Sequence, residues 1–227
     1  MSEPRPRVTV VDYGLGNLFS LKRAVERIGC EALISGDPDT VLASQALILP
    51  GVGAFGDGMK GLAARGLIGP IRRHAASGKP LLGICLGMQL LATSGEEFGP
   101  HEGLDLVRGR VVRFPALVTD GPRFKVPNIG WCPLELAVDK PRGLLAGLAT
   151  GDCVYFVHSY IFVPEGNGAI LARTRYAGVD FCSVLQQGNI MGCQFHPEKS
   201  AEKGLAILAN FLGVGRNAPS PAPIQEG

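Results

Sequence analysis

The sequence predicts an α/β protein with a mostly parallel central sheet flanked by helices. Two observations favour this class. In the first half, short apolar runs alternate with amphipathic stretches, and in the second half strand-like runs follow one another directly. Strands that alternate with helices form parallel sheets that are covered on both faces. We therefore expect a parallel sheet with an additional antiparallel strand region.

The first half of the chain alternates strand and helix signals. Apolar residues three and four apart predict a helix over 18–28, and Gly29 is its expected C-cap. Asp37 followed by Pro38 is typical of a helix N-cap and first turn. Strands are expected over 8–11, 32–34, 46–49 and 80–84, and further helices over 67–76 and 87–92.

The second half is richer in strand signals and closes with a helix. The expected strands cover 104–114, 134–138, 153–157, 169–175, 181–185 and 191–194, and the helix covers 200–212. No internal repeat or linker interrupts this pattern, so one domain is expected over 1–212. Residues 213–227 contain no core-forming residues in series, which predicts a disordered tail.

Composition and charge exclude several classes of protein. Hydrophobic residues make up 46% and charged residues 19%, which is typical of a packed core and excludes a disordered chain. The formal net charge of +2 gives no support for binding to nucleic acid or to a membrane surface. No apolar run approaches the ~20 residues of a membrane span, and the N-terminus lacks a signal-peptide pattern. We expect a cytoplasmic protein.

Neither a metal nor a cofactor is expected. The six cysteines include no C-x-x-C pair, which argues against a zinc site or a redox dithiol, and most of them are expected to be buried apolar side chains. The segment 12–17 contains part of a dinucleotide fingerprint. Its third glycine is missing, and the second predicted strand is followed by Ser35 and Gly36 and not by an acidic residue. Both departures argue against a nucleotide site.

The pentapeptide GICLG over 83–87 lies between a predicted strand and a predicted helix. It matches the G-x-nucleophile-x-G elbow, with Cys85 in place of serine. The flanking Gly83 and Gly87 avoid the clash that a Cβ would make with neighbouring backbone. Such a turn presents the thiol at the carboxyl end of the sheet, and the following helix N-terminus favours the thiolate. The alternative is a buried cysteine in a glycine-rich turn.

A thiolate nucleophile needs a base, and His196 is the best candidate among four histidines. It ends a strand-like run, and Glu198 follows two residues later across a proline. A carboxylate there can bind one ring nitrogen and leave the other to face a thiol. The alternative is a strand-end histidine beside a solvated glutamate. His74 is expected to be solvated, and His101 to lie in a loop without apolar surroundings.

The loop Pro50-Gly51-Val52-Gly53 follows a predicted strand and supplies a candidate oxyanion hole. A tetrahedral intermediate needs preorganised N–H donors. One comes from Leu86, directly after the nucleophile, and a second usually comes from a loop after a neighbouring strand. By itself this loop is better explained as an ordinary glycine-rich turn between strand and helix.

Three segments together resemble class I glutamine amidotransferases: PGVGAFGDGM (50–59), GICLGMQLL (83–91) and QFHPEKS (194–200). The resemblance covers roughly 8–212 and implies a flavodoxin-like three-layer fold. It implies that Cys85 attacks the side-chain amide of glutamine and forms a glutamyl thioester. His196, oriented by Glu198, would protonate the leaving ammonia and then activate water. The resemblance also implies an oxyanion hole made by Leu86, Val52 and Gly53, and a glutamine site made by Gly53, Gln89, Ser159 and Tyr160.

The segments VDYGLGNL (11–18), KVPNIGW (125–131) and YFVHSY (155–160) resemble the family members that serve histidine biosynthesis. That resemblance implies a heterodimer with a (β/α)₈-barrel cyclase subunit, which uses the ammonia to make imidazole glycerol phosphate and aminoimidazole carboxamide ribonucleotide. The family usually has His at the position of Asn128 and Asn at that of Cys132. Because this segment lies near the subunit interface in the family, Asn128 and Trp131 are interface candidates; core packing is the alternative for Trp131.

Three other functions account for only part of the sequence. The glutaminases of anthranilate or aminodeoxychorismate synthesis share the Cys, His and Glu segments but lack the VP-x-IGW stretch. A non-catalytic binding subunit predicts a lost nucleophile or base, and here Cys85, His196 and Glu198 are all present. A cysteine peptidase does not account for Gln89 or for the HSY sequence over 158–160.

Overall fold

A computed structural model describes residues 6–115 and 125–214. Its main sheet has eight strands in the order β2-β1-β3-β4-β14-β13-β12-β9. The neighbours from β2 to β14 are parallel, and those from β14 to β9 are antiparallel. This confirms a parallel sheet with an antiparallel region. The bounds are β2 Glu31–Ser35, β1 Arg7–Val11, β3 Leu47–Leu49, β4 Leu81–Ile84, β14 Ile190–Cys193, β13 Val179–Gln187, β12 Ile170–Tyr176 and β9 Glu135–Leu136.

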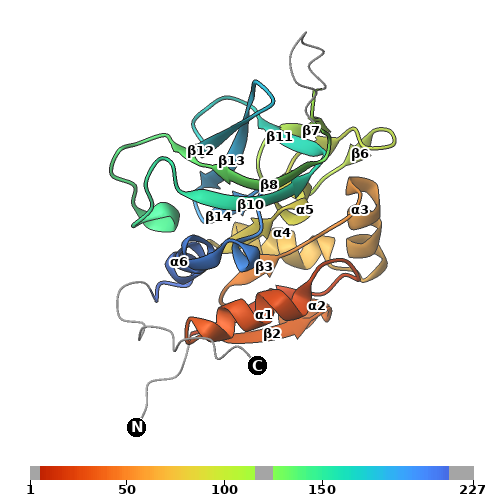
Figure 1. Cartoon of the computed structure of the whole chain (residues 1–227). Helices are drawn as coiled ribbons and strands as arrows, with labels where there is room; N and C mark the ends of the chain where they lie inside the picture. The colour runs from red at the N-terminus through yellow and green to blue at the C-terminus, as the bar shows by residue number, and fades with distance from the viewer. Residues whose placement is uncertain (1–5, 116–124, 215–227) are drawn as a thin grey trace, which may run out of the picture.

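Helices cover both faces of the parallel part. Alternate residues of a strand point to opposite faces, so one side of the sheet packs on one set of helices and the other side on another. Val8 and Val10 of β1 share a core cluster with residues of α1 (Leu18–Arg27) and α6 (Ala201–Phe211). Val11 packs with residues of α2 (Pro38–Ala43), α3 (Phe55–Ala64) and α4 (Ile68–Ala76) on the opposite face. The result is a three-layer α/β arrangement (Figure 1).

Two smaller sheets lie against the antiparallel side of the molecule (Figure 1). One is an antiparallel ribbon of β8 (Asn128–Pro133) and β10 (Cys153–His158). The other has the order β11-β7-β5-β6, with bounds β11 Tyr160–Pro164, β7 Gly109–Arg113, β5 Ser94–Gly95 and β6 His101–Glu102. Short helical segments complete the chain: α5 Leu86–Leu90, η1 Gly143–Leu145 and η2 Pro197–Lys199.

The structure contains a helix, α3, that the sequence analysis did not predict. Three glycines in its ten residues lower its helix propensity. Packing explains all three. A Cβ at Gly56 would lie 2.6 Å from the His101 ring, and one at Gly58 would lie 3.1 Å from the Leu90 side chain. One at Gly61 would lie 2.7 Å from the Tyr13 carbonyl oxygen. The helix therefore depends on close approach to its neighbours rather than on an apolar stripe of large residues.

Several strand boundaries also differ from the expectations. The strand expected over 104–114 is limited to β7, because the preceding residues turn back onto the end of α5 through the hydrogen bonds Leu104 N to Leu90 O and Val107 N to Leu91 O. The strand over 134–138 shortens to β9, and β8 and β11 were not predicted. Of the tail expected over 213–227, residues from 215 onward lie outside the described part.

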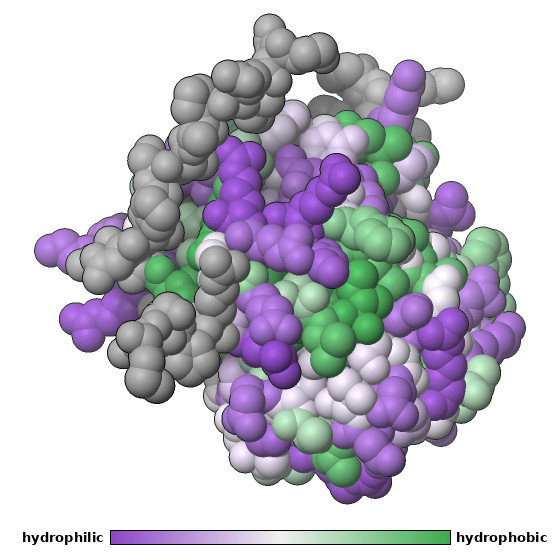
Figure 2. Space-filling model, turned by 90° about the horizontal axis from the view of Figure 1, so that it is seen from below, coloured by the Kyte–Doolittle hydropathy of each residue, from purple (hydrophilic) through white to green (hydrophobic). Residues whose placement is uncertain are grey.

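Most large apolar side chains are buried, and a few are exposed. Cys153 is the exposed cysteine and the other five are buried, which confirms the expectation that most of the cysteines are buried. Seen from below, hydrophobic residues gather near the middle of the face, with hydrophilic residues around them (Figure 2). Across residues 6–115 and 125–214, no helix has the length and apolar character needed to cross a membrane.

Candidate active site

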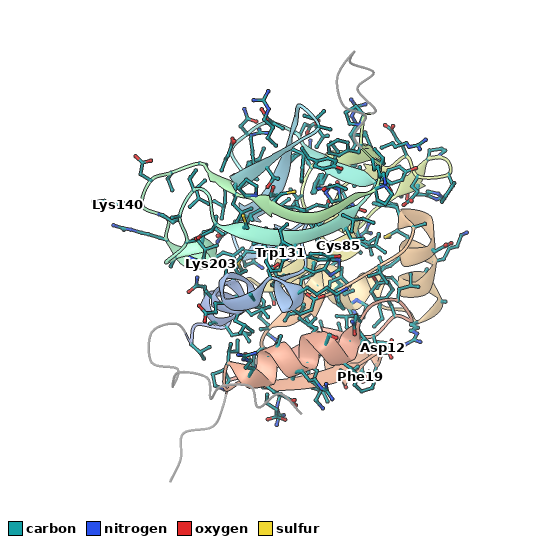
Figure 3. The ribbon with its side chains drawn as sticks, in the orientation of Figure 1. Asp12, Phe19, Cys85, Trp131, Lys140 and Lys203 are labelled. Atoms are coloured by element: carbon teal, nitrogen blue, oxygen red, sulfur yellow. The ribbon has the colours of Figure 1, made fainter. Side chains whose placement is uncertain are left out.

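Cys85 joins β4 to α5 near the centre of the molecule (Figure 3). Its backbone has φ 53° and ψ −112°, a conformation that non-glycine residues rarely adopt. A Cβ at Gly83 would lie 2.7 Å from the backbone N of Met88, and one at Gly87 would overlap the Leu49 carbonyl oxygen. The flanking glycines are therefore needed for the tight turn, as the sequence analysis argued.

The Cys85 thiol is buried among polar groups. Its Sγ donates to the Val157 carbonyl oxygen at 3.8 Å and accepts from Gln194 Nε2 at 3.8 Å. Gln194 is fully buried in the segment that follows β14, two residues before His196. Gln194 was not among the predicted site residues, although it lies inside the QFHPEKS segment that carries the resemblance.

His196 and Glu198 form a buried pair beside this thiol. Nδ1 of His196 donates to Glu198 Oε1 at 2.8 Å, and the two side chains are only 3% and 4% exposed. Pro197 begins the η2 turn, which brings the carboxylate back onto the ring, and Ser200 Oγ donates to the His196 carbonyl oxygen at 2.6 Å. The bond between His196 and Glu198 fixes the tautomer and leaves Nε2 as the second functional nitrogen.

The second ring nitrogen of His196, Nε2, is not used by Glu198 and is the one left to interact with the Cys85 sulfur. Among the described residues Nε2 makes no hydrogen bond of ordinary geometry. Burial alone would lower the pKa of His196, but interactions with the Cys85 sulfur and with Glu198 outweigh it and raise the pKa to about 10. The electrostatic influence of Cys85 therefore reaches the ring.

The oxyanion loop, which we define as residues 50–53, follows β3 next to the elbow. Val52, Gly53 and Leu86 line the same cavity as Cys85. Gly53 has φ 102°, a conformation that favours glycine. Leu86 is the first residue of α5, so its N–H has no acceptor within the helix. The structure thus brings together all three residues expected to supply oxyanion donors.

The cavity beside Cys85 has a volume of about 430 Å³ and contains further predicted residues. Gln89, Ser159 and Tyr160 line it, as the resemblance implied. Glu97 also lines it and was not predicted, since no motif surrounds it. Its Oε2 accepts from the Phe55 N–H at 2.8 Å at the start of α3, and burial raises its pKa. His196 and Glu198 are not part of the cavity lining.

Hydrogen bonds connect α5, the helix after Cys85, to Tyr160 of β11 and to Gln194. Gln89 Nε2 donates to the Tyr160 carbonyl oxygen at 3.0 Å and to Gln194 Oε1 at 3.1 Å. Gln194 in turn donates to Cys85, so the nucleophile candidate, the elbow helix and β11 share one buried polar network.

Asn128 extends this network instead of lying on the surface. His158 Nδ1 donates to the same Tyr160 carbonyl oxygen at 3.0 Å, so its Nε2 accepts from Asn128 Nδ2 at 3.2 Å. Cys132 Sγ donates to Asn128 Oδ1 at 3.8 Å. Burial lowers the pKa of His158 to about 4, which keeps this ring neutral. Asn128 is 1% exposed, so its side chain is not directly available as an interface contact.

Trp131 has the opposite character. It lies on β8 with 53% of its surface exposed, opposite Tyr155 of β10, against which its ring packs edge-on at 6.0 Å. Core packing is therefore not its role. Figure 3 shows Trp131 beside the β8/β10 ribbon and Asp12 near the end of β1.

Two histidines differ from the expectations. His74 is buried rather than solvated, because the outer face of α4 carries Arg72 and Arg73 while His74 points inward; its Nε2 donates to the Pro80 carbonyl oxygen at 3.1 Å. His101 stacks on Phe55 with ring centroids 6.4 Å apart. Within the described ranges, no group of three or more His, Cys, Asp or Glu side chains is arranged to hold a metal ion.

Comparison with known proteins shows which family the chain belongs to. Residues 9–214 match the family model described as glutamine amidotransferase class-I. The chain belongs to the class I glutamine amidotransferase family. The amidotransferase relatives include imidazole glycerol phosphate synthase subunit HisH of Syntrophotalea carbinolica, 47% identical over 90% of this chain and 98% of the relative. The HisH subunit of Geobacillus thermodenitrificans is 49% identical over 91% and 95%. Within the class I amidotransferases, the chain groups with these HisH subunits.

Solved structures of related proteins support the fold. A glutamine amidotransferase structure has a TM-score of 0.69 at 23% identity and covers 91% of this chain and 99% of its own. PurLQS from Thermotoga maritima has a TM-score of 0.69 at 19% identity, covering 92% and 99%. At these identities the likeness concerns the fold alone, and it confirms the predicted α/β class.

Proposed function

We propose that this chain hydrolyses glutamine to glutamate and ammonia with a Cys85–His196–Glu198 triad, and that it supplies the ammonia to the cyclase of imidazole glycerol phosphate synthase. The observation that carries the proposal is the buried 2.8 Å bond between His196 Nδ1 and Glu198, which lies beside a cysteine on a strained elbow. The HisH relatives are named as subunits of that synthase, which supports the choice of reaction.

The proposed chemistry uses both ring nitrogens of His196. The Cys85 sulfur attacks the carboxamide carbon of glutamine, a C–S bond forms, and the carbonyl oxygen becomes an oxyanion. His196 Nε2 gives its proton to the leaving nitrogen, the C–N bond breaks, and ammonia leaves behind a glutamyl thioester. His196 then takes a proton from water, which attacks the thioester, and glutamate leaves as the proton returns to sulfur.

The raised pKa of His196 suits the first step. With a pKa of about 10, the ring is an imidazolium at neutral pH when the sulfur is a thiolate. In that ion-pair state, the proton needed by the leaving ammonia is in place before glutamine binds. Glu198 stabilises that charge and keeps Nδ1 protonated. N–H groups of Leu86 and of the oxyanion loop would hold the oxyanion.

The cavity offers partners for both ends of glutamine. Glu97 is the carboxylate among the lining residues, and we assign it to the α-ammonium group of the substrate. A bound cation would offset the burial that raises the pKa of Glu97. Gln89 and the main chain of Ser159 and Tyr160 remain the proposed contacts to the rest of the substrate.

The proposed partner is a (β/α)₈-barrel cyclase subunit in a heterodimer, with imidazole glycerol phosphate and aminoimidazole carboxamide ribonucleotide as products. The exposed Trp131 on the β8/β10 ribbon is the residue that we assign to that interface. A cytoplasmic location stays a prediction from the sequence.

Substitution of the nucleophile tests this function. Cys85→Ala should abolish glutamine-dependent synthesis by the complex with the cyclase, whereas synthesis from free ammonia should continue. Cys153→Ala is the matched control, because Cys153 is an exposed cysteine outside the cavity, and it should retain full glutamine-dependent activity. Glutamine-driven turnover by Cys85→Ala would show that the nucleophile is assigned wrongly.

A further inference from the structure

Tyr13 has no part in the function proposed above, yet it contacts the oxyanion loop directly. It follows β1 in the segment 12–17 and is 2% exposed. Its hydroxyl donates to the Pro50 carbonyl oxygen at 2.7 Å. Pro50 is the first residue of the oxyanion loop, so a side chain from the first strand–helix connection holds the beginning of a loop that follows β3.

This bond controls the orientation of one complete peptide unit. The Pro50 carbonyl and the Gly51 N–H belong to the same planar peptide group, so holding the oxygen also fixes the amide. Space around Gly51 is equally restricted: a Cβ there would overlap the Tyr13 hydroxyl and would lie 2.9 Å from Leu86 Cβ and 3.2 Å from the Gly87 N. The loop therefore passes between Tyr13 and the nucleophile elbow with no room for a side chain.

Tyr13 is itself held in place by its neighbours. Gly61 of α3 packs so closely that a Cβ there would lie 3.1 Å from the Tyr13 ring. On the preceding residue, Arg65 forms an ion pair with the Asp12 carboxylate at 3.1 Å and donates to the Asp12 carbonyl oxygen at 2.7 Å. Burial, with a contribution from Cys85, raises the pKa of Tyr13, so the hydroxyl remains a hydrogen-bond donor.

We propose that Tyr13 is a positioning residue that holds the Pro50–Gly51 peptide and so aims the N–H groups of Val52 and Gly53 at the oxyanion. The inference rests on the proposed glutaminase function. Only two flexible torsions per residue separate the anchored peptide from these donors, because each peptide unit is planar. Donors aimed in advance stabilise the tetrahedral intermediate without reorganisation during the reaction. Tyr13 is not among the residues that line the cavity, so it acts on the donors through the loop.

The test compares Tyr13→Phe with the unsubstituted chain in its complex with the cyclase. Loss of one well-formed hydrogen bond is worth ~1 kcal/mol, so we expect kcat for glutamine hydrolysis to fall about 5- to 10-fold while KM changes less than about twofold. Glutamate γ-semialdehyde provides a second readout. The Cys85 thiol adds across its aldehyde, sulfur to carbon and proton to oxygen, and this tetrahedral adduct should weaken by about the same factor as kcat.

Alkylation of Cys85 by iodoacetamide separates the loop from the nucleophile, since that reaction forms no oxyanion. Its rate should be the same in Tyr13→Phe and in the unsubstituted chain. Tyr176→Phe is the matched control: the Tyr176 hydroxyl also donates to a backbone carbonyl, that of Lys125 at 2.9 Å, outside the cavity lining. It should leave kcat unchanged.

Three results would overturn the inference: an unchanged kcat in Tyr13→Phe, an alkylation rate that falls together with kcat, or an equal loss in Tyr176→Phe. Assays run well below the melting temperature of each variant keep unfolding out of the comparison. Failure of the proposed function is distinguishable, because in that case the unsubstituted complex would hydrolyse no glutamine, or Cys85→Ala would remain active.

Discussion

Gly87→Ala tests whether the elbow depends on the close approach of α5 to the end of β3. The added Cβ would overlap the Leu49 carbonyl oxygen and would lie 2.7 Å from the Leu49 carbonyl carbon, whereas ordinary contact begins at 3.4 Å. The two backbone segments must therefore separate by at least 0.7 Å. Neither can yield easily, because β3 is paired with β1 on one side and with β4 on the other.

The size of the effect follows from this overlap. Overpacking of a buried site costs ~1–3 kcal/mol, and a clash between two backbone segments belongs at the upper end. In a chain of this length ~3 kcal/mol lowers the melting temperature by ~6–12 °C. The displacement also moves the oxyanion loop away from Cys85, and a misplacement of ~1 Å can cost ~10²-fold in rate. We therefore expect kcat/KM for glutamine to fall by one to two orders of magnitude, within that ~10²-fold.

Thermal unfolding followed by circular dichroism and glutamate release in the cyclase complex measure the two effects. Gly168→Ala is the matched control, because a Cβ there has no atom within 4 Å and its φ is not in the left-handed region. It should change the melting temperature and the activity little. If Gly87→Ala melted within ~1 °C of the unsubstituted chain and kept its activity, the steric argument for the elbow would be refuted.

Three further predictions concern the triad, pH and the interface. Glu198→Gln removes the charge that stabilises His196, so kcat should fall ~10²–10⁴-fold with KM little changed in steady-state assays; a loss below threefold would contradict the triad. His158 has its pKa lowered to about 4 in the folded chain, against about 6.5 when unfolded. Between these two pH values His158 binds a proton in the unfolded chain but not in the folded chain. The free energy of unfolding, measured by urea denaturation, should therefore fall by about 3 kcal/mol as pH falls from about 6.5 to about 4. A free energy of unfolding that does not change over this pH range would exclude a neutral buried ring. Trp131, the single tryptophan, is half exposed, so its emission should shift to the blue when the cyclase binds, and an unchanged spectrum would place the interface elsewhere.

The parallel part of the fold was predictable because the residues of each strand and their immediate neighbours carry the strand pattern. Val8–Val11 is a run of β-branched residues, and Asp37 caps α2 through its bond to the Thr40 N–H, as the Asp-Pro pattern indicated. The helix α3 was not predictable from its own sequence, because its glycines are explained by contacts with Tyr13, Leu90 and His101, which are distant in the chain. Local propensity and tertiary packing disagree there, and packing prevails.

Some residues of the candidate site could likewise be predicted from the sequence, and others could not. Cys85, His196 and the oxyanion loop lie in motifs whose residue types follow from the chemistry, so their positions could be expected from the sequence. Glu97 could not, because it is an isolated carboxylate that reaches the cavity from the segment between β5 and β6. His74 was judged from its charged neighbours in sequence, whereas its burial depends on which side of α4 faces the sheet.

The Tyr160 carbonyl oxygen receives hydrogen bonds from both Gln89 and His158, and this determines which substitutions the network can tolerate. Because the shared acceptor belongs to the main chain, no exchange of the side chain at position 160 deletes it. Side chains near Gln89 or near His158 can then be substituted while the carbonyl oxygen that both residues share remains. Asn128 and Cys132 are connected to this acceptor through His158. Such an acceptor allows side chains beneath the β8/β10 ribbon to be substituted while the backbone geometry next to Cys85 is kept.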